Sequence, residues 1–209
     1  MMGIAPEGRP FIAGAWGIEL ALALLPTWWP ALIWLPIAVW VVAFFRDPSR
    51  TGPRGEQYLI APADGKVVAI VEQDEPDFLK QRAKRVSIFM NVFSVHVNRY
   101  PVSGVIGYRH YHPGKFGHAA EEKASLDNEQ ASIGVTSTRG RVLVRQIAGL
   151  IARRIVTDHD LGTSVRQGDR MGMIRFGSRV DLFFAPEARV LVNSGDRTKA
   201  GETVVAQWD

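Results

Sequence analysis

Two hydrophobic patterns divide this chain. Between Leu20 and Phe45 no charged residue occurs, whereas the rest of the chain mixes charges with short alternating apolar runs. About 20 apolar residues suffice to cross a bilayer, but prolines interrupt this run at positions 26, 30 and 36. A proline inside a helix removes a hydrogen bond and clashes with the preceding turn. The pattern therefore predicts two short helices, at about 10–25 and 30–45, rather than one spanning helix.

The flanks of the apolar run indicate a membrane anchor. Arg9 precedes the run, Arg46, Arg50 and Arg54 follow it, and five of the six tryptophans lie in it or just before it. Positive charge on both sides suits a hairpin with two cytoplasmic ends, or a segment lying among anionic headgroups. A signal peptide would end in a small-residue cleavage site, and no such pattern follows. We expect residues 1–46 to anchor the protein at the cell membrane, with the remainder on the cytoplasmic side.

The rest of the chain predicts a β domain. Residues 47–56 are rich in Pro, Gly and Arg and are typical of a linker, and 57–209 would form the catalytic domain. Alternation and β-branched content predict strands at 66–71, 86–89, 105–111, 131–137, 141–147, 171–175, 180–184 and 188–192, and a short helix is expected at 77–84. The fold class is mainly β (α+β). Segments 61–68 and 165–174 resemble the barrel-sandwich folds of lipoyl and biotinyl carriers, although Lys66 lacks the flanking Met of a carrier lysine.

Composition excludes several functions. The absence of cysteine rules out disulfides, thiol nucleophiles and thiolate metal sites. A formal net charge of +4 and a pI near 9.6 suit contact with an anionic surface. The basic residues are scattered without interleaved aromatic residues, so anionic lipid is a better partner than nucleic acid.

The most informative short motif is Phe176-Gly177-Ser178-Arg179-Val180-Asp181, which holds the only Gly-Ser step in the sequence. A Gly-Ser bond can cleave itself and convert the serine into a pyruvoyl group, although a lone Gly-Ser is more often a turn. Asp64 and His96 could join Ser178 as an oriented base and nucleophile, a set recognised by geometry and not by order. Taken singly, Asp64 fits a turn and His96 fits a hydrogen-bonded core residue.

Several further segments match one family in order and spacing. They are Phe44-Phe45-Arg46-Asp47-Pro48, Ala61-Pro62-Ala63-Asp64-Gly65, Phe93-Ser94-Val95-His96-Val97-Asn98-Arg99, Pro113-Gly114-Lys115-Phe116, Lys123-Ala124-Ser125 with Asn128-Glu129, and Arg175 to Asp181. Together they resemble the phosphatidylserine decarboxylase family, specifically its short, membrane-anchored branch.

The resemblance implies a proenzyme that cleaves itself between Gly177 and Ser178. The products would be a large chain, 1–177, and a small chain, 178–209, that starts with a pyruvoyl group made from Ser178. His96 would be the base and Asp64 would orient its imidazole. The pyruvoyl group would form a Schiff base with phosphatidylserine and release CO₂ and phosphatidylethanolamine, with His96 returning the proton. Arg99 and Lys115 are candidate substrate contacts, and a higher homo-oligomer of the processed protein stays open.

Some nearby patterns point elsewhere. Leu161-Gly162-Thr163-Ser164 resembles the Leu-Gly-Ser-Thr cleavage motif of larger bacterial relatives, but places Thr after Gly, and we reject it as the cleavage site. The larger relatives carry a second His where this chain has Arg99. His110, His112 and His118 form a cluster without an obvious carboxylate, so no metal site is predicted.

Two alternatives remain for the function. One is decarboxylation of another lipid with a serine headgroup, such as archaetidylserine. The other is a membrane-tethered barrel-sandwich adaptor without catalytic activity.

Overall fold

The computed structural model describes residues 2–114, 128–149, 154–175 and 178–209. The chain divides into two compact units, residues 1–49 and 50–209. Each unit is described here by itself.

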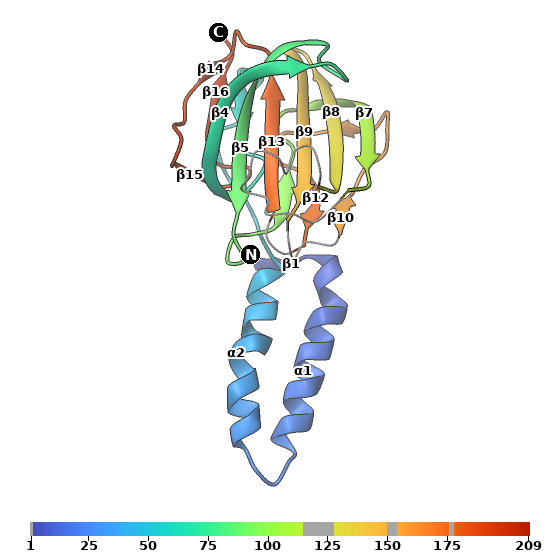
Figure 1. Cartoon of the computed structure of the whole chain (residues 1–209), viewed down its shortest axis with the longest axis vertical. Helices are drawn as coiled ribbons and strands as arrows, with labels where there is room; N and C mark the ends of the chain where they lie inside the picture. The colour runs from blue at the N-terminus through green and yellow to red at the C-terminus, as the bar shows by residue number, and fades with distance from the viewer. Residues whose placement is uncertain (1, 115–127, 150–153, 176–177) are drawn as a thin grey trace. The chain divides into compact units, whose positions relative to one another are not determined.

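The first unit is a helical hairpin (Figure 1). Its elements are β1 (Met2–Ile4), a 3-10 turn (Pro6–Gly8), α1 (Arg9–Ala23), α2 (Trp29–Phe44) and β2 (Arg46–Pro48), and β1 pairs antiparallel with β2. The predicted hairpin of two short helices is confirmed. Pro30 lies in the first turn of α2, where a proline costs no hydrogen bond, and only Pro36 falls inside a helix.

Small side chains let the two helices pack closely. Ala15 of α1 and Ala31 and Ala38 of α2 are buried, and the Trp34 indole N–H donates to the Ala15 carbonyl at 2.9 Å. Most larger apolar side chains of the hairpin face outward, among them Leu24, which is 78% exposed. Among the helices described, none combines the length and apolar character that a membrane crossing requires.

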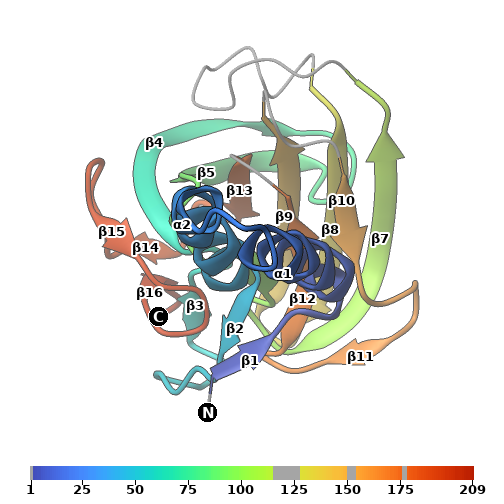
Figure 2. The same ribbon diagram turned by 90° about the horizontal axis from the view of Figure 1, so that it is seen from below.

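The second unit is built around one curled antiparallel sheet of eight strands. Its order is β11 (Ser164–Val165), β7 (Gly104–His112), β8 (Gln130–Ser137), β9 (Gly140–Ala148), β13 (Ser178–Phe184), β5 (Gln81–Met90), β4 (Gly65–Glu75) and β15 (Arg197–Thr198). Figure 2 shows the strong curl, which places β4 and β7 on opposite sides of the unit. The predicted mainly β fold is confirmed.

Two three-stranded sheets complete the second unit. One has the order β10 (Ile155–Thr157), β12 (Arg170–Ile174), β6 (Val97–Arg99), and the other has the order β14 (Arg189–Val190), β16 (Val204–Gln207), β3 (Tyr58–Ile60). Side chains from these sheets join the concave face of the large sheet in one apolar core, which includes Met171, Val205 and Leu59.

Strand register divides the side chains of the large sheet between two faces. On β13, Val180, Leu182 and Phe184 belong to the main core, and Ser178 shares their side because side chains alternate along a strand. This side is called the inner face below. Arg179, Asp181 and Phe183 point to the opposite, outer face, where Phe183 joins a small cluster with Phe78 and Leu79.

The helix expected at 77–84 does not form. The buried Glu75 carboxylate accepts hydrogen bonds from the backbone N–H groups of Phe78 and Leu79, at 2.9 and 2.7 Å, and so closes a tight turn. The chain then enters β5 at Gln81, whose strand pairs with β4 on one side and β13 on the other. Long-range pairing outweighs local helix propensity in this segment.

Candidate active site

Ser178 is the first residue of β13 and is fully buried. It pairs with Met90 of β5 on one side and with Ala148 of β9 on the other. Its hydroxyl lies 3.5 Å from the Met90 sulfur. Gly177, the residue before it, lies outside the part of the chain that the structure describes. The predicted nucleophile therefore sits at a strand end, on the inner face, between two neighbouring strands.

His96 lies beside the segment that leads to Ser178. It immediately precedes β6, it is fully buried, and its carbonyl accepts a hydrogen bond from the backbone N–H of Ile174 at 3.3 Å. Ile174 ends β12, and the chain reaches Ser178 four residues later. The His96 backbone is thus tied to the chain just before the predicted cleavage site.

A hydrogen bond selects the tautomer of His96. Its Nδ1 lies 3.0 Å from the Ser94 carbonyl oxygen. A carbonyl only accepts, so Nδ1 carries the hydrogen in the neutral ring and Nε2 carries the lone pair. Nε2 is therefore the nitrogen that can act as a base.

Two buried amides continue from Ser178 along the inner face. Asn98 of β6 directs its Nδ2 toward the Met90 sulfur at 3.7 Å, and its Oδ1 accepts from Gln146 Nε2 at 2.8 Å. Both amide side chains are fully buried. Ser178, Met90, Asn98 and Gln146 thus form a continuous chain of contacts, called the polar chain below.

The polar chain is not predicted by the sequence motifs. Asn98 lay inside a recognised segment but received no role, and Gln146 belonged to no motif. The available signal was a single polar residue at an inner position of an apolar strand, since Val142, Val144 and Ala148 share the side of Gln146.

An ion pair fixes the start of β13 from the outer face. Arg179 Nε and Nη2 each lie 2.9 Å from a different carboxylate oxygen of Asp181, and the side chains are 2% and 0% exposed. A two-pronged pair of this kind is geometrically restrictive. The Arg-Val-Asp part of the motif therefore combines an outer ion pair with Val180 in the core.

The two carboxylate oxygens of Asp64 bind partners other than His96. Its Oδ2 lies 2.7 Å from Arg50 Nη2, and its Oδ1 accepts from the backbone N–H of Ala200 at 2.7 Å. The described partner of His96 Nδ1 is the Ser94 carbonyl, so the orientation of His96 by Asp64 stays a prediction. Asp64 connects Arg50 to the turn 198–203 near the C-terminal end, and Arg50 also lies 3.5 Å from Glu202.

The remaining predicted residues lie apart from Ser178 or outside the described segments. Arg99 Nη1 donates to the Gly168 carbonyl at 3.0 Å, whereas Lys115 and His118 fall in a segment that is not described. His110 and His112 lie on β7, where His110 stacks with Tyr108. Within the described segments, no group of three His, Asp or Glu side chains is arranged to hold a metal.

Asn128 and Glu129 support the strand beside Ser178. Asn128 Nδ2 donates to the Ala148 carbonyl at 2.7 Å, and the Ala148 N–H donates to the Glu129 carbonyl at 2.9 Å. Ala148 is the β9 partner of Ser178.

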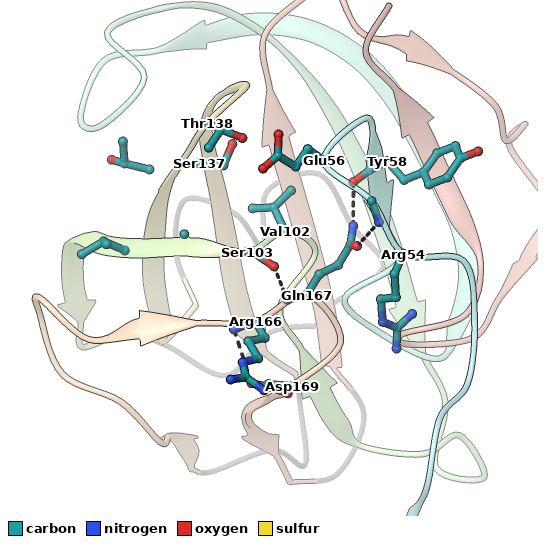
Figure 3. Close-up of a pocket in the computed structure, with 14 residues that line it drawn as sticks. Arg54, Glu56, Tyr58, Val102, Ser103, Ser137, Thr138, Arg166, Gln167 and Asp169 are labelled. Atoms are coloured by element: carbon teal, nitrogen blue, oxygen red, sulfur yellow. Dashed lines mark hydrogen bonds between the residues drawn. The ribbon is translucent and has the colours of Figure 1, made fainter.

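A pocket in the second unit lies away from these residues. It has a volume of about 760 Å³, and Figure 3 shows Gln167 at its wall, bonded to the Tyr58 carbonyl and the Gly55 N–H. Its lining includes Ser137, at the β8–β9 turn, the end of β9 opposite to Ala148. None of Ser178, His96 and Asp64 lines it.

Fold and site together define a mainly β protein with a buried serine at a strand start, a buried histidine whose backbone is bonded to the end of the preceding strand, and an N-terminal apolar hairpin. The family model of phosphatidylserine decarboxylase matches residues 37–206. The chain is 45% identical to the phosphatidylserine decarboxylase proenzymes of Nitrosomonas eutropha and Symbiobacterium thermophilum, over 98% of this chain and 95% of each relative. It is 44% identical to that of Magnetococcus marinus, over 96% of this chain and 93% of the relative.

The chain therefore belongs to the phosphatidylserine decarboxylase family, and the predicted resemblance is confirmed. It is an enzyme of a carboxy-lyase family.

The role of Asp64 in connecting Arg50 to the Ala200 backbone can be tested by hydrogen exchange. Arg50→Ala and Asp64→Asn should both speed hydrogen exchange at the Ala200 amide, by at least about tenfold, because each removes a charge-assisted contact from the same network. The double variant should add little, since contacting residues are not additive. Exchange is read by mass spectrometry of the full chain in detergent.

Arg82→Ala is the matched control, because its ion pair with Glu72 is exposed and such pairs contribute little. Unchanged exchange at Ala200 in both variants would contradict the assigned role of Asp64.

Proposed function

We propose that this chain is a phosphatidylserine decarboxylase proenzyme that cleaves itself between Gly177 and Ser178. The processed protein then converts phosphatidylserine into phosphatidylethanolamine and CO₂. The observation that carries this proposal is the burial of Ser178 at the start of β13, with the His96 segment bonded to the strand that precedes it. The matched relatives are named proenzymes, which supports cleavage, and phosphatidylserine decarboxylases, which supports the substrate.

Cleavage begins at the Ser178 hydroxyl. Its oxygen attacks the Gly177 carbonyl carbon as His96 Nε2 takes the hydroxyl proton, and the peptide N–C bond is exchanged for an ester. Removal of the proton on the α-carbon of residue 178 then expels the Gly177 carboxylate and leaves dehydroalanine. Its imine form adds water and releases ammonia, so that residue 178 ends as a pyruvoyl group.

Strand pairing keeps the small chain in place after cleavage. β13 lies between β5 and β9, β15 pairs with β4, and β16 pairs with β3. In each pair the partner strand precedes residue 177. The Arg50–Asp64–Ala200 contacts add a polar attachment between the two chains. Breaking one peptide bond therefore leaves residues 178–209 held within two sheets.

The pyruvoyl group supplies a carbonyl that condenses with the headgroup amine and takes up the electron pair released with CO₂. Side chains of the protein then bind the headgroup and accept or donate protons. His96 Nε2 is the base in cleavage and, once protonated, the donor to the substrate α-carbon. The apolar inner face around Ser178 limits the access of water to that carbon.

The hairpin gives the protein access to a lipid substrate. Its outward-facing apolar side chains include Leu24 and Trp28, which are 78% and 70% exposed. Each helix is about 23 Å long at 1.5 Å per residue, whereas the hydrocarbon core is about 30 Å thick. The hairpin would insert partway into the membrane from the cytoplasmic side, and the second unit would work at that surface.

Cleavage is tested with three variants. Ser178→Ala should remain one chain of 209 residues, and His96→Ala should cleave about 100-fold or more slowly, in line with loss of a general base. His110→Ala is the control, because that histidine is exposed on β7, and it should cleave normally. Denaturing mass spectrometry follows the intact chain over time. Normal cleavage of either Ser178→Ala or His96→Ala would refute the assigned roles.

Membrane attachment is tested at the hairpin tip. Leu24→Asp should reduce co-sedimentation of the full chain with anionic vesicles, because an ionised side chain is costly in the hydrocarbon region. Leu161→Asp is the matched control, since Leu161 is 59% exposed in the second unit. Equal binding by Leu24→Asp and the wild type would count against insertion of the hairpin. Protease access in sealed vesicles of known orientation tests the cytoplasmic placement.

A further inference from the structure

The side-chain carbonyl of Gln146 is buried and lacks a hydrogen-bond partner among the described residues. Its side chain is fully buried on β9 and its Nε2 donates to Asn98 Oδ1 at 2.8 Å. Over the described segments of the chain, its Oε1 has no hydrogen-bond partner. A buried carbonyl without a partner loses its hydration and gains nothing in return. Such a local departure from a satisfied core is expected mainly at functional sites.

The direction of the two amides follows from the Met90 sulfur. A thioether can only accept a hydrogen bond, so Asn98 turns its NH₂ group toward Met90, at 3.7 Å. Its carbonyl then faces Gln146, and Gln146 must present its own NH₂ group to it. The group left over on Gln146 is therefore the carbonyl oxygen and not the amide nitrogen.

The Gln146 carbonyl lies on the same face of the sheet as Ser178 and close to it in the strand register. On β9, Gln146 is two residues from Ala148, the partner of Ser178, and both residues lie on the inner face. Diagonal neighbours across an antiparallel pair are about 7–8 Å apart, within reach of a long side chain. The polar chain also links Gln146 to the Ser178 hydroxyl through Asn98 and Met90.

We propose that Gln146 Oε1 accepts a hydrogen bond from the amine of the lipid headgroup and positions that amine beside residue 178. This inference rests on the proposed function. In a phosphatidylserine headgroup the carboxylate and the phosphodiester only accept hydrogen bonds, so the ammonium is the group that a free carbonyl can bind. A neutral carbonyl also lets the amine lose a proton before it reacts, whereas a carboxylate would favour the charged form.

The test compares Gln146→Met with Gln146→Glu. The Met variant keeps the side-chain length, replaces the carbonyl with a weakly accepting thioether and removes the Nε2 donor to Asn98. Burial favours the neutral acid of Glu, whose O–H can replace Nε2 at Asn98 and whose carbonyl remains. Gln130→Met is the matched control, because Gln130 lies on the adjacent β8 and pairs with Ile147, on the outer face. All three variants are made in the full chain.

Two measurements are made once cleavage has been confirmed. Gln146→Met should cleave normally but raise the KM for phosphatidylserine about tenfold or more, the effect of losing a hydrogen bond to a charged group. It should also lose the extra thermal stability that vesicles containing phosphatidylethanolamine give over vesicles of phosphatidylglycerol, a lipid without an amine. Gln146→Glu and Gln130→Met should keep both properties.

A wild-type KM and an unchanged amine-dependent stabilisation in Gln146→Met would overturn the inference. Loss of cleavage in Gln146→Met would also overturn it, because Gln146 would then serve folding or cleavage. A wild-type protein that neither cleaves nor decarboxylates would instead refute the proposed function, so the two failures are distinguishable.

Discussion

The pairing of β13 between β5 and β9 is the constraint on which the rest of the structure depends. It places Ser178 opposite Met90 and Ala148 and directs its side chain to the inner face. The Arg179–Asp181 pair on the outer face restricts the same end of the strand. Because a one-residue slip would exchange the two faces, the proposed reaction of Ser178 depends on this register. The same pairing would hold the small chain after cleavage.

A buried polar group in an apolar core carries a free-energy cost, and the polar chain concentrates that cost near Ser178. The inner face beyond it is apolar at Val144, Val180 and Leu182. Asn98 and Gln146 satisfy each other in part, at 2.8 Å. An isolated, unsatisfied amide of this kind costs about 1–3 kcal/mol, so a purely structural role would favour an apolar residue at position 146.

The sequence predicted the parts of the fold that local pattern controls. Prolines and the uncharged run predicted the hairpin, and alternation predicted the long strands β4, β5, β7, β8, β9 and β13. Residues 77–84 were predicted wrongly because the Glu75 turn and the pairing of β5 involve partners outside that window. Short strands such as β6 and β15 gave no periodic signal and depend on distant partners.

In the candidate site, too, sequence motifs predicted some residues, whereas the contacts between distant residues were not predicted. The resemblance of the motifs identified the family and predicted Ser178 and His96 as site residues. The ion-pair partner of Asp64 depends on how the chain folds and was not predicted. Arg50, 14 positions away, occupies the carboxylate, and no spacing rule predicts that choice. Gln146 was missed because its importance arises from the register of β9 against β13.

Self-cleavage would make residue 178 the reactive N-terminus of a separate small chain. The most direct measurement is the mass and N-terminal group of the fragments of wild-type protein under denaturing conditions. Self-cleavage predicts a fragment 1–177 and a fragment 178–209 that is lighter by one ammonia than a peptide starting with serine and has no free α-amine. An intact chain in an active preparation, or a small fragment that begins with unmodified serine, would contradict it.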